Sequence, residues 1–380
     1  MDFELTEEQK MLRTMVQDFA VKELEPIAAQ IDEESRFPAE SVKKMAELGL
    51  FGLGLPEECG GSGGATELCL AVEEISRVCA ATGVILLVTA GLGIEPVAAF
   101  GTEEQKKRFV APVAAGEKMA AFALTEAGAG SDPIALETTA ARRDGGYVIN
   151  GNKVFITNGA EADVILVFAT MDKSLRHKGI VALVVEKGTP GFSVGKHENK
   201  LGIRGSSTVE LIFEDCFVPE ENRLGNEGDG FKIAISAIDA SRVVVAAQAL
   251  GIAQGAFDKA LAYAKERQQF GQPIANFQAI QWMLADMATQ IDAARLLTYR
   301  AAYLQDKGLP FVKEAAMAKV FAAETSKLVT NNAIQIHGGY GYIKEYPLER
   351  YFRDAKITEI YEGTSEMQRM TIARQLIREG

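Results

Sequence analysis

The sequence is poor in the residues on which metal, disulfide and serine–histidine chemistry depend. Its 380 residues include 3 histidines and 4 cysteines. No histidine stands in an HExxH pattern or beside a GxSxG elbow, so metal hydrolysis and Ser-His catalysis have little support. The cysteines are too widely spaced for a zinc cluster and too few for a disulfide framework, which predicts buried free thiols. The residues concerned are His177, His197 and His337, and Cys59, Cys69, Cys79 and Cys216.

Long hydrophobic runs and an excess of basic residues are also missing. No uncharged apolar run reaches about 18 residues, and the first four residues are acidic where a signal or transit peptide would be basic, so we expect a cytoplasmic protein without membrane insertion. Lys and Arg total 40 against 52 Asp and Glu, a net charge of -12, which argues against nucleic acid as a partner. A hydrophobic content of 47% with 24% charged residues is typical of a folded chain, here long enough for two or three domains.

Helical spacing dominates the first third of the chain. Thr6 with Gln9 fits a capping box, and further helices are predicted over 38–48, 68–100 and 102–113, the second of them apolar and buried. The glycine-rich run CGGSGG at 59–64 lacks the Lys-Ser/Thr ending of a P-loop and follows no clear strand. We interpret it as a flexible connection.

After Phe122 the hydrophobic residues alternate with polar ones, and their helical spacing returns near Phe231. Asn150-Gly151 between two apolar triplets predicts a β-hairpin. Further strands are expected over 164–170, 180–186 and 209–213, with a turn at 189–191, and Ala-rich helices over 242–267, 277–304 and 311–336. The prediction is an α+β multidomain fold with an N-terminal α-helical domain (1–120), a middle β-barrel or sandwich domain (121–228) and a C-terminal four-helix bundle (229–380).

Three motifs contain the residues suited to chemistry. They read ALTEAGAGSD at 123–132, QIHGGYGY at 335–342 and IYEGTSE at 360–366. The glycines of the first let backbone amides approach a ligand closely. Glu362 in the third stands just before a predicted helix, where the helix dipole favours an acidic residue in any case. Local sequence alone therefore leaves a catalytic and a structural interpretation of Glu362 open.

With these motifs the chain resembles the acyl-CoA dehydrogenase family along its whole length, closest to the short-chain, butyryl-CoA type. Two long family signatures fit without a gap, over 123–135 and 335–354, and FITN at 155–158 and RQQFG at 267–271 fit as well. The resemblance implies an FAD flavoprotein of fatty acid β-oxidation type. Such an enzyme oxidises the α,β bond of a short-chain acyl-CoA to the trans-2-enoyl-CoA and passes electrons to electron-transfer flavoprotein.

The resemblance also assigns a base to the α-carbon, at Glu362. A carboxylate suits this role in a dry cleft, because desolvation raises its pKa and makes it a stronger base. In isovaleryl-type and long-chain relatives the base precedes the Arg of an Asp-x-x-Arg segment, but here that residue is Ser241, before Arg242. Glu362 would remove the pro-R proton, and its backbone amide, with a ribityl hydroxyl of FAD, would polarise the thioester oxygen.

The other site residues are implied by the same resemblance. FAD would be shared between chains of a homo-oligomer, a tetramer built as a dimer of dimers. The implied FAD contacts are Phe122, Leu124, Thr125, Ser131, Phe155, Thr157, Arg267, Phe270, Gln278, Gln335, Gly339, Thr364 and Glu366; the implied substrate contacts are Ser131, Asp239, Arg242, Tyr361 and Gly363. For the aromatic residues strand core is the alternative explanation, and for Glu366 a helix cap.

The acyl group and the direction of reaction stay open. Glutaryl-CoA members carry an Arg at a position aligned with Gly83, and no basic residue lies between Arg77 and Lys106, which disfavours a dicarboxylic acyl group. The small residues of 89–93 could widen the acyl pocket for a branched or cyclic group, although helix packing on small residues also explains them. Enoyl-CoA reduction and a non-catalytic CoA-binding scaffold are the alternative functions, and the presence of Glu362 opposes the scaffold.

Overall fold

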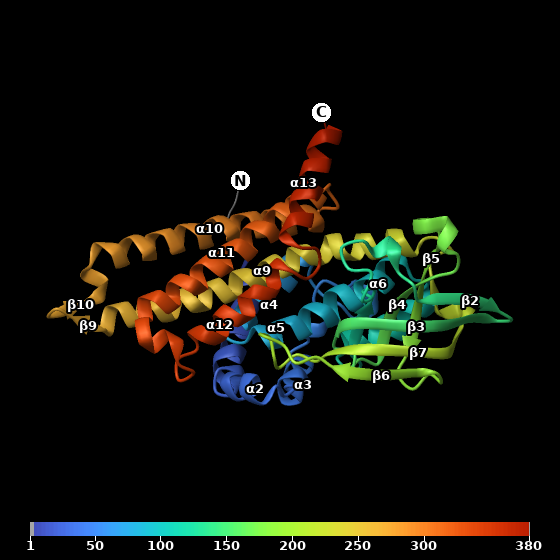
Figure 1. The fold of residues 1–380 in the computed structure, drawn as a ribbon, viewed down its shortest axis with the longest axis horizontal. Coiled ribbons are helices and arrows are strands. Elements are labelled where there is room, and N and C mark those ends of the chain that lie inside the picture. The colour runs from blue at the N-terminus through green and yellow to red at the C-terminus, as the bar shows by residue number, and fades with distance from the viewer. Residues whose placement is uncertain (1–3, 380) are drawn as a thin grey trace.

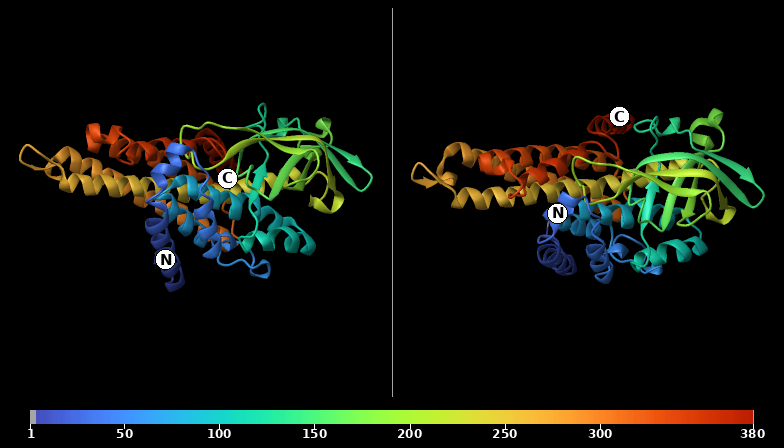
Figure 2. Two further views of the ribbon diagram at one scale, coloured as in Figure 1. Left: turned by 90° about the horizontal axis from the view of Figure 1, so that it is seen from below. Right: turned by 60° about the horizontal axis from the view of Figure 1, so that its bottom comes forward.

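A β-sheet from the middle of the chain lies beside a long helical bundle (Figure 1), and shorter N-terminal helices pack on one side of both, the lower side in Figure 2. The computed structural model describes residues 4–379. The outer limits of the predicted divisions, at 1 and 380, lie outside these residues. The N-terminal helices are α1 (Glu7–Phe19), α2 (Ala28–Glu34), α3 (Ala39–Glu47), α4 (Ala65–Ser76), α5 (Ala80–Leu86), α6 (Glu95–Phe100), α7 (Glu103–Gln105) and α8 (Ala111–Ala114).

The capping box predicted at Thr6 is confirmed, and a second one at Thr102 begins the helix predicted from that residue, but the single helix predicted over 68–100 is wrong. The helix is interrupted at Cys79, whose backbone is extended (φ -145°, ψ 97°), and again before Pro96 in the first turn of α6. Proline lacks the N–H that would continue a preceding helix, so it starts a new one. Between these points lies a π-helical segment, η4 (Leu87–Gly93).

The loop at 59–64 is also not a free connection. Its backbone exchanges hydrogen bonds with the chain at 52–54, including Ser62 N to Gly52 O at 2.9 Å. A Cβ at Gly61 would lie 2.2 Å from the carbonyl oxygen of Leu55, so the two segments can cross only at a glycine. The prediction of four buried free thiols is confirmed.

The sheet has the strand order β6-β7-β3-β2-β4-β5-β8, with β1 parallel to β4. Strands predicted at 164–170 and 180–186 coincide with β4 and β5, and the strand predicted at 209–213 lies inside the longer β7. The strands are β1 (Ala120–Ala123), β2 (Thr139–Arg143), β3 (Gly146–Thr157), β4 (Val164–Thr170), β5 (Ile180–Glu186), β6 (Phe192–His197), β7 (Thr208–Pro219) and β8 (Arg223–Leu224).

The hairpin predicted at Asn150-Gly151 is wrong, because β3 runs straight through these residues. The turn lies earlier, at Asp144-Gly145, where Arg143 of β2 pairs with Gly146 of β3. Gly151, with φ +141°, instead sits at a register shift between β3 and β7. A β-bulge and a hairpin turn both demand an unusual backbone, so glycine marks either one.

The C-terminal helices form the predicted bundle, in which α9, α10 and α11 lie along the long axis of the molecule (Figure 1). The first of them begins well before residue 242, and its N-terminal half packs on the sheet while its other end reaches the β9–β10 hairpin. The elements are α9 (Gly230–Glu266), β9 (Gln268–Gln269), β10 (Gln272–Pro273), α10 (Gln278–Asp306), α11 (Val312–His337), α12 (Leu348–Ala355) and α13 (Ser365–Glu379).

Two helical stretches are long and apolar enough to cross a membrane by length and composition. They are Ala80–Phe100 and Gly230–Glu266, and most of the apolar part of each is buried inside the protein. Burial of this kind is typical of core helices in soluble proteins, which pass the same test.

Candidate active site

Glu362 lies on the loop between the last 3-10 turn and α13, in an unusual backbone conformation. Its φ is +51° and that of Gly363 is +92°. A left-handed conformation costs a non-glycine residue about 1–2 kcal/mol, so other contacts must hold it there. Among residues 4–379 the backbone N–H of Glu362 donates no hydrogen bond. The loop therefore presents an unused donor next to a carboxyl side chain.

Three side chains from three helices hold this loop through its carbonyl oxygens. Arg242 Nε of α9 donates to Glu362 O at 3.2 Å. Gln368 Nε2 of α13 donates to the same oxygen at 3.2 Å and to Gly363 O at 2.9 Å. Lys319 Nζ of α11 donates to Gly363 O at 2.7 Å. These bonds offset the backbone strain at Glu362.

One oxygen of the Glu362 carboxyl group is withdrawn from water, while the residue as a whole is half-buried. Its Oε2 is buried and has no hydrogen-bond partner, and burial raises the pKa of Glu362 to about 7. The Ser241 hydroxyl, Lys319 and Arg242 act in the opposite direction, although Ser241 Oγ completes no hydrogen bond of normal geometry. A carboxyl group with a pKa near 7 is suited to take up a proton at neutral pH.

The residues beside Glu362 connect it to the helical core. The Tyr361 hydroxyl donates a hydrogen bond to the Gln248 side chain, and Gln248 Nε2 donates to Ala80 O at 3.1 Å. Arg242 is bonded to Asp239 on the same face of α9. The predicted substrate contacts Asp239, Arg242, Tyr361 and Gly363 thus gather around Glu362, whereas Ser131 is exposed on its loop.

A buried ion pair supports the loop of the first motif. Lys153 Nζ, with no exposed surface, lies 2.7 Å from Glu126 Oε1 and donates to Leu124 O at 3.0 Å. The Glu126 carboxylate also accepts from the backbone of Thr138 at 3.0 Å, and Thr125 O accepts from Val154 N at 2.9 Å. Leu124 and Thr125 are therefore fixed from both sides.

The predicted flavin wall lies where the sheet meets α9. Phe122 rests against Phe168 with ring centroids 4.9 Å apart, and both it and Ile238 of α9 pack on one core cluster. Phe155, with φ +59°, is 62% exposed, so strand core does not explain it. Thr157 ends β3, and Asn158 after it donates to Thr89 Oγ1 at 3.1 Å.

A second group of predicted FAD contacts lies at the other end of the bundle. Arg267 follows α9 roughly 25 residues after Arg242, which at 1.5 Å per residue is about 37 Å. There a hollow of about 440 Å³ is lined by Arg267, Gly339 and aromatic neighbours, and Phe270 is 93% exposed. Gln278 and Gln335 are exposed beside it. Within one chain these residues cannot reach the surroundings of Glu362.

The residues after Glu362 begin α13. Thr364 Oγ1 accepts from Met367 N at 3.3 Å. Glu366 is exposed in the first turn, and hydrogen bonds from the helix N-terminus lower its pKa. The helix-cap interpretation of Glu366 therefore fits this chain.

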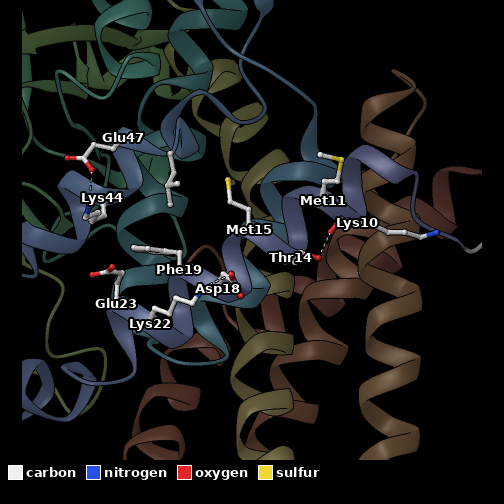
Figure 3. Close-up of a pocket in the computed structure, with 11 residues that line it drawn as sticks. Lys10, Met11, Thr14, Met15, Asp18, Phe19, Lys22, Glu23, Lys44 and Glu47 are labelled. Carbon is white, nitrogen blue, oxygen red and sulfur yellow. Dashed lines mark hydrogen bonds and ion pairs between the residues drawn. The ribbon is translucent and has the colours of Figure 1, made fainter.

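A further groove lies elsewhere, on the outer face of α1 and α3 (Figure 3). It measures about 700 Å³, and its walls combine Met11, Met15 and Phe19 with charged side chains such as Lys22 and Glu47. None of the residues predicted for cofactor or substrate lines it. In the described part of the chain, no group of three His, Cys, Asp or Glu side chains could hold a metal ion.

Lys319, Gln368 and the Lys153–Glu126 pair were not found by sequence reasoning. Lys319 carried a usable signal, since it is a lone lysine among the alanines of an apolar helix face. Glu126 lies inside the first motif, but its partner is 27 residues away. No local pattern identifies such a pair.

The chain is similar to known proteins along nearly its whole length. The acyl-CoA dehydrogenase N-terminal, middle and C-terminal domains match residues 6–117, 121–216 and 228–377. A short-chain specific acyl-CoA dehydrogenase of Clostridium acetobutylicum is 53% identical over 379 residues, covering all of both chains. An acryloyl-CoA reductase (NADH) of Anaerotignum propionicum is 54% identical over 381 residues, covering all of this chain and 96% of that one. A chain in the solved structure of the electron transferring flavoprotein of Acidaminococcus fermentans is 51% identical, with full coverage of both chains and a TM-score of 0.98.

Proposed function

The chain belongs to the acyl-CoA dehydrogenase family, and from that premise we propose that Glu362 is the base with which it dehydrogenates a short-chain acyl-CoA. The family is FAD-dependent. Bound FAD supplies the acceptor for the hydride that leaves the β-carbon. The observation that carries the assignment is the buried, unpartnered Glu362 Oε2 beside an unused backbone N–H.

The residues of the chain account for the proton and for the charge that develops on the substrate. Glu362 takes the proton from the α-carbon, and its burial keeps water from competing for the carboxylate. Its backbone N–H is free to donate to the thioester oxygen, where negative charge grows as the proton leaves. Arg242 and Gln368 donate to the carbonyl oxygen of the same residue and so fix the loop.

The pH dependence of flavin reduction tests this role. Because only the unprotonated carboxylate accepts a proton, and burial raises the pKa of Glu362 to about 7, the reduction rate should rise with pH through a midpoint near 7. Single-turnover mixing with butyryl-CoA across pH 5 to 9 measures this rise of the reduction rate with pH. A flat profile would contradict a Glu362 base.

We further propose that each FAD site is built by two chains of a homotetramer arranged as a dimer of dimers. The support is the separation of the implied FAD contacts into two groups about 37 Å apart along α9. Phe122, Leu124, Thr125, Phe155, Thr157, Thr364 and Glu366 belong to the Glu362 end, whereas Arg267, Phe270, Gln278, Gln335 and Gly339 belong to the other end. The exposed Phe270 and the guanidinium of Arg267 suit contact with a cofactor held by another chain.

Subunit complementation tests the shared site. A Glu362→Gln chain and an Arg267→Ala chain, each nearly inactive alone, should regain activity when co-expressed. In a mixed dimer one of the two sites receives both wild-type residues, so up to about half of the wild-type rate is expected in that dimer. Activity of co-purified, doubly tagged hybrids measures it, and inactive hybrids would place both residues in one chain's site.

Electron-transfer flavoprotein is the electron acceptor in this function, in keeping with the similarity to a chain from the flavoprotein structure of Acidaminococcus fermentans. Enoyl-CoA reduction is the second candidate, favoured by the 54% identity with the acryloyl-CoA reductase. In that direction Glu362 would return the proton to the α-carbon. Oxidation of NADH by the purified protein with an enoyl-CoA would support the reductase.

The segment 89–93 is the part of the chain on which we place acyl specificity. It lies in the π-helical segment η4, a geometry frequent at functional sites, and Thr89 accepts the hydrogen bond of Asn158. A Cβ at Gly83 would lie 2.1 Å from Ser76 Oγ, which opposes a side chain there that could pair with a second carboxylate. A Cβ at Gly91 would meet only Leu68 Cδ2, at 3.7 Å.

Filling the space at Gly91 should therefore narrow the acyl pocket. In Gly91→Val we expect kcat/KM for a branched acyl-CoA to fall about tenfold more than that for butyryl-CoA, the usual effect of a few carbon atoms in an apolar pocket. Steady-state assays with both substrates measure the ratio, with Gly91→Ala as the milder control. An equal loss for both substrates would mean that these small residues serve helix packing alone.

The division of the chain near 121 and 228 and the cytoplasmic location stay predictions. Refolding of the separate segments and fractionation of cells would test them.

A further inference from the structure

Lys319 is a buried lysine whose charge has no direct ion pair. It lies on the inner face of α11 among Ala315, Ala318 and Ala322, and none of its surface is exposed. Within residues 4–379 no carboxylate approaches its ammonium group closely enough for a salt bridge, and its hydrogen bond goes to Gly363 O at 2.7 Å. Burial of an ammonium group without a counterion is strongly unfavourable, so a lysine at this place needs an explanation.

The charges around Lys319 come from three sides. Glu362 is the strongest acidic influence, Glu359 and Glu366 are weaker, and Arg242 of α9 opposes them. Glu359 is already paired with Lys356 at 2.7 Å, and Glu366 is exposed, where water screens it. Asp239, the other acid on α9, is bonded to Arg242. The ammonium group therefore acts mainly on Glu362.

We propose that Lys319 is a positioning residue for the base: it anchors the carbonyl of Gly363, which holds Glu362 in its left-handed conformation, and its positive charge favours the carboxylate form of Glu362. This inference rests on the proposed function. Lys319 would then position Glu362 in addition to filling space in the helical bundle.

Two effects follow and can be separated by substitution. The charge lowers the pKa of Glu362, more than Arg242 does, so a neutral residue at 319 should raise that pKa above about 7. The hydrogen bond holds the loop, so losing the donor should lower the rate at every pH. Because burial lowers the pKa of Lys319 itself to about 8, the support from its charge fades above pH 8.

The test compares Lys319→Met, which lacks both charge and donor, with Lys319→Gln, which keeps a donor. In the holoenzyme, the pH midpoint of the flavin-reduction rate should rise by about one unit in both variants. At pH values well below the midpoint, this shift lowers the rate about tenfold. Only Lys319→Met should also lose plateau rate at high pH. Infrared difference spectra give a readout without turnover: the protonated-carboxyl band that Glu362→Gln removes should titrate at higher pH in both variants.

Lys200→Met is the matched control, since Lys200 is another lysine whose burial lowers its pKa, and it donates to Ser206 O at 2.6 Å on a different loop. It should leave the midpoint in place.

An unchanged midpoint in folded Lys319 variants would overturn the inference, and so would an equal shift in Lys200→Met. If neither neutral variant folds, Lys319→Arg carries the test: its permanent charge should keep the midpoint at or below the wild-type value, and a raised midpoint overturns the inference. Full activity of Glu362→Gln, measured alongside, would instead overturn the proposed function.

Discussion

Replacing Glu362 by glutamine should lower the rate of flavin reduction by about a thousandfold while FAD and acyl-CoA still bind. A positioned general base contributes about 100- to 10,000-fold, and glutamine has nearly the same shape but accepts no proton. Its backbone N–H and the carbonyl contacts of Arg242 and Gln368 stay in place. Stopped-flow reduction by butyryl-CoA gives the rate, and the flavin spectrum with a bound substrate analogue reports binding.

Stability provides a control that does not depend on turnover. Because folding raises the pKa of Glu362 from 4.5 to about 7, the wild type loses stability as pH rises through this window. Glu362→Gln should therefore be more stable than the wild type at pH 8, by up to about 3 kcal/mol, and no more stable at pH 4.5. Glu345→Gln, which changes an exposed acid within the signature 335–354, should change neither rate nor stability. A near-normal rate in Glu362→Gln would remove this residue from the mechanism.

Replacing Lys153 by methionine should destabilise the protein by about 3–5 kcal/mol, because it leaves the buried Glu126 carboxylate without its cation. The loop bearing Leu124 and Thr125 also loses the bond at Leu124 O, so weaker FAD retention is expected. Chemical denaturation at pH 7 and the FAD content after dialysis measure the two effects.

Glu126, the partner of Lys153, allows the effect of the unpaired charge to be separated from the effect of lost packing. Adding Glu126→Gln to Lys153→Met removes the unpaired charge and should restore part of the lost stability. Lys187→Met, on the exposed side of the sheet domain, is the surface control. A loss below about 1 kcal/mol in Lys153→Met would show that water reaches Glu126 and that the pair is not a buried support of the loop.

Local patterns predicted the elements whose sequences are unambiguous. The continuous apolar runs of β4 and β5 matched to the residue, because β-branched stretches bounded by turn residues fit few other structures. Asn150-Gly151 misled because glycine serves a bulge as well as a turn, and the choice depends on β7, about 60 residues away. The break of the predicted helix at Cys79 likewise has no local signal, since no proline or glycine lies between residues 68 and 82.

In the site, too, local motifs could be recognised from the sequence, whereas contacts between distant residues could not. Glu362 could be singled out because a family motif marks it, whereas its raised pKa depends on burial and on residues from α9 and α11 that are distant in sequence. Lys153 is recognisable as unusual only when its lack of exposure is known, whereas Lys319 already stands out as a lone lysine among the alanines of a helix face. The division of the FAD contacts into two groups follows from the part of α9 between Arg242 and Arg267, which was already predicted as a helix.

The central claim, that this chain dehydrogenates a short-chain acyl-CoA with FAD, is tested most directly by anaerobic mixing of the purified protein with a panel of acyl-CoAs. Linear C4 to C6, branched, cyclic, aromatic and glutaryl thioesters are added while the visible flavin absorbance is followed. We predict rapid bleaching by butyryl-CoA or another small acyl-CoA and none by glutaryl-CoA. A yellow protein that none of the short-chain thioesters bleaches, or one that stays colourless with added FAD, would contradict the account.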